Sequence, residues 1–231
     1  MQITLLDKNL DFPKSEEANI DGLIAVGGDL EPARLLAAYE RGIFPWYNPG
    51  ELKMWWTPPE RAIIPLTGIK IHKSMRNELN RQRYTVTYDT CFKDVVINCA
   101  KASRRRQEDT TETWIGDEIV EAYCMLYELG VGHSVEVWDG DKLVGGLYGV
   151  SIGRMFFGES MFAFATNASK VALIHLIKKI APMGFGPIDC QIMNDHLKSL
   201  GAVLMKRDEF EKVLDKYLTA GKTFKGSWNE I

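Results

Sequence analysis

One carboxylate lies inside an apolar, aromatic run, and it is the first residue of the chain that could do chemistry. Glu159 is the only charged residue of MFFGESMF, residues 155–162. Burying a lone carboxylate is costly unless a partner compensates for it. Two interpretations are open: a strand-end glutamate paired with an arginine or a backbone amide, or a carboxylate that faces a substrate in an aromatic pocket.

A second pair of polar residues lies in the short segment FGPIDCQ, residues 185–191. Asp189 and Gln191 are two positions apart, so in a strand their side chains point to the same face. A carboxylate and an amide on one face can orient an amine and accept its proton. The alternative is a strand end that faces solvent.

Other reaction classes find little support. Ser160 is followed by Met161 and Phe162, so the chain lacks the G-x-S-x-G elbow of a serine hydrolase. The four cysteines form no CxxC pair, and the histidines have no metal-ligand spacing. We therefore expect no metal and no cofactor.

The elements that must position these groups alternate between helix and strand. Residues 143–150 and 155–162 predict two strands, and Asn167 or Ser169 is expected to cap a helix through residue 180. The whole pattern indicates an α/β (α+β) fold with a mixed sheet flanked by helices. The GES and DCQ strands are candidates for the place where neighbouring strands diverge and a ligand binds.

Residues 43–66 interleave aromatic rings with prolines. Trp46, Trp55 and Trp56 lie among five prolines, which exclude a regular helix or a central strand. Rigid loops with rings can stack on bases or form a pocket, and they can also simply pack between domains. We place a small N-terminal domain at 1–65 and a second domain at 66–231.

Charge is segregated along the 231 residues, although the net charge is only −3. Residues 61–106 hold eleven Lys and Arg against three Asp and Glu, and both flanking parts are acidic. This pattern indicates a polyanionic partner or, alternatively, solvated helix faces. No apolar run reaches the length of a membrane span, and the first residues do not resemble a signal peptide. We expect a cytoplasmic protein.

Many strings of the chain, in order, resemble those of one family, the leucyl/phenylalanyl-tRNA–protein transferases. The resemblance covers nearly the whole chain and is specific because of the number of matching strings. They are GLIAVGGDL, LLAAYERGIFPW, MWWTPPERAII, TWI, HSVEVW, LVGGLYGV, FFGESMF, NASKVAL, IDCQ and HLKSLGA.

The resemblance implies an aminoacyltransferase. Such enzymes move Leu or Phe, and sometimes Met, from aminoacyl-tRNA to the α-amino group of proteins that begin with Arg or Lys, which marks these proteins for N-degron proteolysis. It also implies a small N-terminal domain and a C-terminal GNAT-like domain. The coenzyme A signature of GNAT enzymes is missing before Asn167, which is consistent with a tRNA-linked donor.

Residue roles follow from the same match. Asp189 corresponds to the carboxylate that takes up a proton from the attacking amine, and Gln191 to the glutamine that relays that proton or orients the amine. Glu159 corresponds to the acidic residue that receives the basic acceptor end or holds the donor aminoacyl group. The reaction is the aminolysis of an ester, in which orientation supplies much of the rate.

Further assignments are hypotheses about binding. We expect the donor side chain in an apolar pocket of Phe156, Met161, Leu173 and Ile188. Trp56 and Trp114 are expected near the 3′ adenosine. The following residues are expected to contact tRNA phosphates: Arg61, Lys73, Arg76, Arg104, Arg105 and Arg106. We expect a monomer without a membrane partner.

Two rival functions remain open at this point. One is a GNAT-like enzyme that uses acyl-coenzyme A, which coenzyme A binding would reveal. The other is a non-catalytic RNA-binding module. A strong effect of Asp189→Asn on turnover but not on tRNA affinity would exclude the module.

Overall fold

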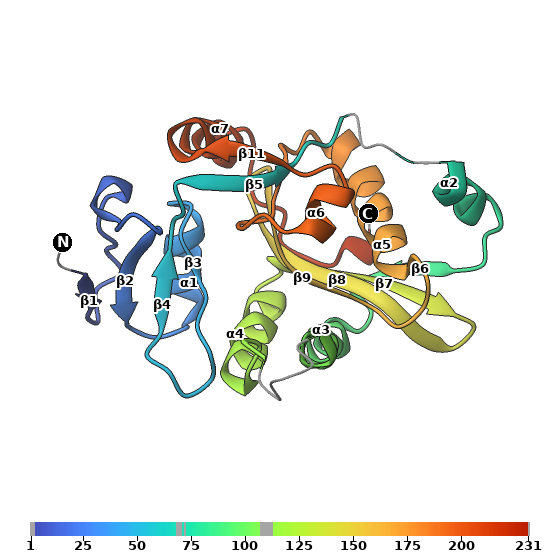
Figure 1. Ribbon diagram of the computed structural model, residues 1–231, viewed down its shortest axis with the longest axis horizontal. Coiled ribbons are helices and arrows are strands. Elements are labelled where there is room, and N and C mark those ends of the chain that lie inside the picture. The colour runs from blue at the N-terminus through green and yellow to red at the C-terminus, as the bar shows by residue number, and fades with distance from the viewer. Residues whose placement is uncertain (1–2, 68–70, 72, 107–112, 231) are drawn as a thin grey trace.

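Two β-sheets form the framework of the protein, for which a computed structural model describes residues 3–67, 71, 73–106 and 113–230 (Figure 1). The smaller sheet has four strands in the order β1 (Thr4–Leu6), β2 (Leu23–Gly27), β4 (Met54–Trp56), β3 (Phe44–Pro45). Helix α1 (Pro32–Tyr39) joins β2 to β3, with its proline in the first turn, where the missing N–H costs nothing. A 3-10 turn covers Ser15–Glu17.

The larger sheet has seven strands and carries the candidate residues. Their order is β11 (Val203–Lys206), β5 (Glu60–Ile64), β10 (Ile188–Asp189), β9 (Met155–Ala163), β8 (Lys142–Ile152), β7 (Gly132–Asp139), β6 (Thr85–Tyr88). β10 pairs in parallel with β9, whereas the other neighbouring pairs are antiparallel. The predicted mixed sheet is therefore confirmed. β5 precedes the expected boundary at residue 65, yet it pairs in this second sheet.

Helices cover both faces of the larger sheet. α3 (Phe92–Arg106) and α4 (Asp117–Glu128) lie on one face, and α5 (Ala168–Ile180) and α6 (Asp195–Ser199) lie on the other (Figure 1). Successive side chains of a strand point to opposite faces of the sheet, so β8 packs against both layers of helices. Leu147 packs with α5, whereas Tyr148 packs with α3 and α4. The remaining helical segments are α2 (Lys73–Asn80), α7 (Arg207–Thr219) and the 3-10 turns Ala181–Met183 and Trp228–Glu230.

The hydrophobic core is continuous between the two sheets. One cluster of buried side chains joins Ile24, Leu35 and Trp55 of the N-terminal part to Tyr123 and Phe157 of the larger sheet and its helices. The N-terminal part therefore packs against the face that carries α3 and α4. This packing brings α1 close to β9, where Glu159 lies.

Candidate active site

A cavity of about 700 Å³ opens where β9 and β10 diverge. Phe156 and Phe157 pair with Ile188 and Asp189, and beyond that point the two strands separate. Glu159 and Gln191, both predicted from the sequence, line this cavity. So do five residues expected to bind substrate: Trp114, Phe156, Met161, Leu173 and Ile188.

Glu159 is held by two tyrosine hydroxyls that come from different parts of the fold. Tyr39 of α1 donates to Oε1 at 2.7 Å, and Tyr123 of α4 donates to Oε2 at 2.7 Å. The two hydroxyls also contact each other. Burial and the neighbouring carboxylate raise the pKa of both phenols well above the usual value, so they remain protonated donors.

The Glu159 carboxyl is poised to change its charge near neutral pH. Removal from bulk water raises its pKa to about 7, and the nearby Asp189 carboxylate acts in the same direction. The two tyrosine hydrogen bonds oppose this rise because they stabilise the ionised form. A carboxyl group with such a pKa can accept a proton at neutral pH, as a general base must.

Tyr39→Phe and Tyr123→Phe should each move the titration of Glu159 to higher pH. Each variant removes a hydrogen bond that favours the carboxylate, and we expect a shift of about one pH unit. The shift is measurable by NMR titration of a selectively labelled Glu159 side chain. Tyr47→Phe is the control, because Tyr47 donates to Glu118 and neither residue lines the cavity. An unchanged titration in both tyrosine variants would contradict this account.

Asp189 lies behind the cavity wall, not in the cavity. Its side chain is completely buried and forms a bidentate ion pair with Arg61, with Nε–Oδ1 at 2.8 Å and Nη2–Oδ2 at 2.7 Å. The prediction that Asp189 and Gln191 point to the same face is wrong. β10 ends at Asp189, and Gln191 adopts a left-handed conformation with φ 57°, so strand alternation no longer applies.

Gln191 connects the buried ion pair to the cavity. Its backbone N–H donates to Asp189 Oδ1 at 3.0 Å, and its side-chain Nε2 donates to Glu159 Oε1 at 3.3 Å. A left-handed conformation is unfavourable for a residue other than glycine unless the surroundings enforce it. The Asp189 carboxylate supplies that enforcement and thereby directs the glutamine amide toward Glu159.

Arg61 was expected to contact tRNA, and its burial corrects that expectation. Only 1% of its side chain is exposed. Besides Asp189, it donates to the Gly42 carbonyl at 2.7 Å and lies over the rings of Phe44 and Phe210. Because three hydrogen bonds and the planar face of its guanidinium are engaged inside the protein, Arg61 is a positioning residue for Asp189.

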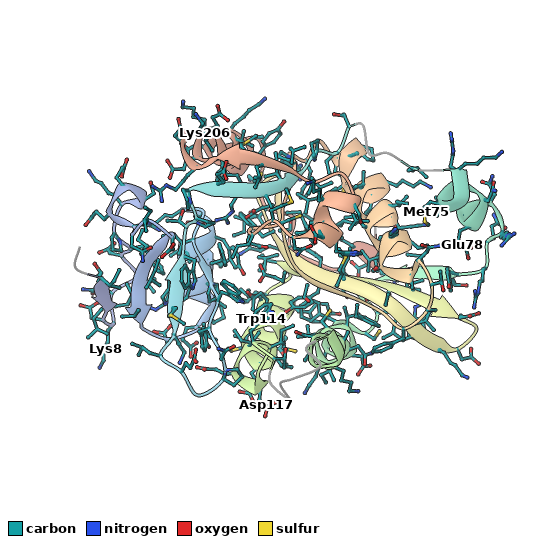
Figure 2. The ribbon with its side chains drawn as sticks, viewed as in Figure 1. Lys8, Met75, Glu78, Trp114, Asp117 and Lys206 are labelled. Atoms are coloured by element: carbon teal, nitrogen blue, oxygen red, sulfur yellow. The ribbon has the colours of Figure 1, made fainter. Side chains whose placement is uncertain are left out.

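Of the two tryptophans expected at the substrate site, one lines the cavity and the other does not. Trp114 lies between the two sheets, just before α4, and lines the cavity as predicted (Figure 2). Trp56 does not line it. Its indole N–H donates to the Trp46 carbonyl at 2.7 Å, and its ring packs against Trp46, which lines the cavity and is 43% exposed.

The other expected tRNA contacts lie in two places. Lys73 and Arg76 are exposed on α2, at the end of the molecule away from the four-stranded sheet (Figure 1). Arg104–Arg106 form the last turn of α3, and their side chains lie outside the part of the structure that is described.

Sequence reasoning missed the two tyrosines. Tyr39 shares a helical apolar spacing with Leu35 and Leu36, which is typical of a core position, and Tyr123 lies in a helical segment with no distinguishing pattern. They are 120 and 36 residues from Glu159 in the chain, so no local spacing indicates the contact. For the aromatic, proline-rich segment, the sequence left pocket formation and packing between domains open, and Trp46 of this segment lines the cavity.

Neither a metal centre nor a membrane-spanning helix is present among the described residues. Within them, no group of three or more His, Cys, Asp or Glu side chains is arranged to hold a metal ion. None of the helices in the described ranges is long and apolar enough to cross a membrane.

Family models and individual relatives of the chain agree on one family. The model of the family Leucyl/phenylalanyl-tRNA protein transferase matches residues 63–215, and that of the Leucyl/phenylalanyl-tRNA protein transferase N-terminal domain matches residues 28–59. The leucyl/phenylalanyl-tRNA–protein transferase of Flavobacterium psychrophilum is 47% identical over 211 residues. These cover 91% of this chain and 99% of that protein.

Solved structures resemble the fold at low sequence identity. FemX has a TM-score of 0.50 and 10% identity, and the match covers 76% of this chain and 66% of FemX. An aminoglycoside acetyltransferase from an uncultured soil metagenomic sample has a TM-score of 0.41 and 12% identity, with 52% and 86% covered. The predicted fold class, an α/β fold with a mixed sheet flanked by helices, is confirmed.

Proposed function

The chain belongs to the leucyl/phenylalanyl-tRNA protein transferase family, and we propose that it transfers leucine, phenylalanine or methionine from aminoacyl-tRNA to proteins that begin with Arg or Lys. The acceptor is the N-terminal α-amino group. One observation carries the proposal. The Glu159 carboxyl has a pKa of about 7, accepts a hydrogen bond from the Gln191 amide, and lies in a largely apolar cavity.

The apolar part of the cavity supports the choice of donor. Phe156, Met161, Leu173 and Ile188 line it, together with Leu147. An unbranched-at-Cβ side chain such as Leu, Phe or Met is favoured there by apolar burial, and methionine in the wall adapts to ligands of different shape. We propose Trp114 and Trp46 as the rings near the 3′ adenosine, with Trp46 in the place first given to Trp56.

The polar part of the cavity supports aminolysis. The neutral α-amine attacks the ester carbonyl, a C–N bond forms, and the C–O bond to the ribose breaks. Gln191 Nε2 donates to Glu159, which leaves the amide oxygen of Gln191 to orient the amine. Glu159 accepts the proton that the amine loses and returns it to the ribose oxygen as the alcohol leaves.

In this proposal Asp189 and Arg61 act through Gln191. The buried ion pair fixes the backbone conformation at residue 191, and both Asp189 oxygens are already engaged by the Arg61 guanidinium. The product carries a new N-terminal residue that marks it for proteolysis. We propose that the enzyme acts as a monomer in the cytoplasm, and that exposed cations such as Lys73 and Arg76 meet tRNA phosphates.

Transfer of labelled leucine from Leu-tRNA tests the proposal directly. Two versions of one acceptor protein are compared, one beginning with Arg and one beginning with Ala. We expect label on the Arg version alone. Equal labelling of both would contradict the proposed acceptor specificity. Labelling of neither, by a folded protein that binds tRNA, would favour an RNA-binding module over an enzyme.

A further inference from the structure

A second cavity, of about 420 Å³, adjoins the first. Met161 and His196 line both cavities, so these two side chains form the partition between them. The second cavity also has walls from α3, from the residue that follows β9 and from the start of α5, which contribute Ala102, Phe164 and Ser169. Its volume is within the range of cavities that bind small ligands.

The start of α5 is an uncapped helix end beside this cavity. Asn167 takes the N-cap position with φ 65°, but its side chain makes no capping hydrogen bond, contrary to the sequence prediction. The backbone N–H groups of Ser169 and Lys170 have no acceptor among the described residues. Free N–H groups and the positive end of the helix dipole favour an anionic ligand.

Ser169 gives independent support for a polar ligand. Its side chain lines the second cavity, although the residue is only 6% exposed. Its hydroxyl has no hydrogen-bond partner in the ranges that the structure describes. A buried hydroxyl normally finds a partner, and here a ligand in the cavity would supply one.

Phe164 gives the cavity an aromatic surface. Phe164 is 41% exposed, and its ring centroid lies 5.0 Å from that of Phe162. Phe162 is buried and holds the Phe164 ring in place. An exposed ring beside an anion site is the combination that binds a nucleotide, because the base stacks and the phosphate meets N–H groups. A cationic acceptor N-terminus would be disfavoured at the same helix end.

Neighbouring residues of α3 line the two cavities, and this indicates which nucleotide would bind in the second one. Ser103 of α3 lines the first cavity, and its neighbour Ala102 lines the second. In the proposed function the first cavity holds the aminoacyl group and the terminal adenosine. An RNA chain that leaves the first cavity along α3 therefore places its next nucleotide in the second cavity.

We propose that the second cavity binds the nucleotide that precedes the 3′-terminal adenosine of aminoacyl-tRNA. Its phosphate contacts the Ser169 hydroxyl and the first N–H groups of α5, and its base stacks on Phe164. This inference rests on the proposed function and adds a second RNA subsite to it.

The experiment compares two short donors with an acceptor protein that begins with Arg. One donor is the leucyl ester of adenosine, and the other is the leucyl ester of the dinucleotide CpA. We expect kcat/KM of the wild type to be about tenfold or more higher for the dinucleotide, from one stacked base and one phosphate. Phe164→Ala and Ser169→Ala should each remove most of this ratio, whereas Phe164→Tyr keeps it.

Leu204→Ala is the matched control, because Leu204 is a similarly exposed apolar side chain on β11 (48%). It should leave the ratio unchanged. Equal use of the two donors by the wild type would overturn the inference while leaving the proposed function intact, and so would equal losses for both donors in the variants. Transfer from neither donor would overturn the second subsite, and transfer from Leu-tRNA, measured beside them, decides the proposed function separately.

Discussion

Asp189→Asn should lower the free energy of unfolding by about 3–5 kcal/mol, because it leaves the buried Arg61 guanidinium without its counter-charge. Both groups are almost completely excluded from solvent, and the pair closes with two hydrogen bonds. Aminoacyl transfer should fall about a hundredfold at the same time, since the single oxygen left on the asparagine side chain must serve both Arg61 and the Gln191 N–H and holds the backbone at residue 191 less firmly. Urea denaturation and kcat/KM with Leu-tRNA measure the two effects.

A double variant separates stability from positioning. In Arg61→Met with Asp189→Leu, apolar side chains of similar volume replace the ion pair, which often restores stability. We expect this protein to regain part of the lost unfolding free energy and to remain inactive, because no acceptor for the Gln191 N–H is present. If Asp189→Asn lost activity without losing stability, Asp189 would be the direct proton acceptor and the positioning role would be wrong.

Glu159→Gln should lower kcat about a hundred- to ten-thousandfold, the usual loss when a general base is removed. In the wild type the rate should rise with pH through about 7, as the Glu159 carboxyl loses its proton. The variant should lack this rise. Single-turnover transfer between pH 5.5 and 9 measures both effects. Glu118→Gln is the control, since Glu118 contacts Lys53 and Tyr47 away from the cavity.

The Glu159 carboxyl also makes the free energy of unfolding depend on pH. The pKa of Glu159 is raised from 4.5 to about 7 in the folded protein, so between these values the folded state holds a proton that the unfolded chain has lost. The resulting stabilisation is fully present below pH 4.5 and is lost as pH rises through about 7. Glu159→Gln should remove this part of the pH dependence. A pH–rate profile of the same shape in the variant would exclude Glu159 as the proton acceptor.

Much of the candidate site could be predicted from the sequence. A carboxylate in an aromatic run predicted that Glu159 needs a partner or faces a substrate. Two tyrosine hydroxyls are its partners, and it lines the cavity. Apolar spacing predicted the strands and the helix after Asn167. The resemblance predicted the family, which the comparisons confirm.

Other features depended on the tertiary structure. The sequence assigned Arg61 to a basic segment that meets RNA, whereas the fold buries it against Asp189, 128 residues away. It assigned Asp189 and Gln191 to one strand face, whereas the left-handed backbone at Gln191 separates them. It could not select Trp46 over Trp56, because the choice depends on which ring the neighbouring sheet covers.

The sequence by itself determined which residues are apolar, which charges need compensation, and which segments become strands and helices. These properties follow from local periodicity and from the cost of burying a charge. Only the tertiary structure decided which groups compensate each other: Arg61 for Asp189, and Tyr39 and Tyr123 for Glu159. A local pattern states that a buried polar group needs a partner, but packing of distant elements determines which partner comes within hydrogen-bond distance.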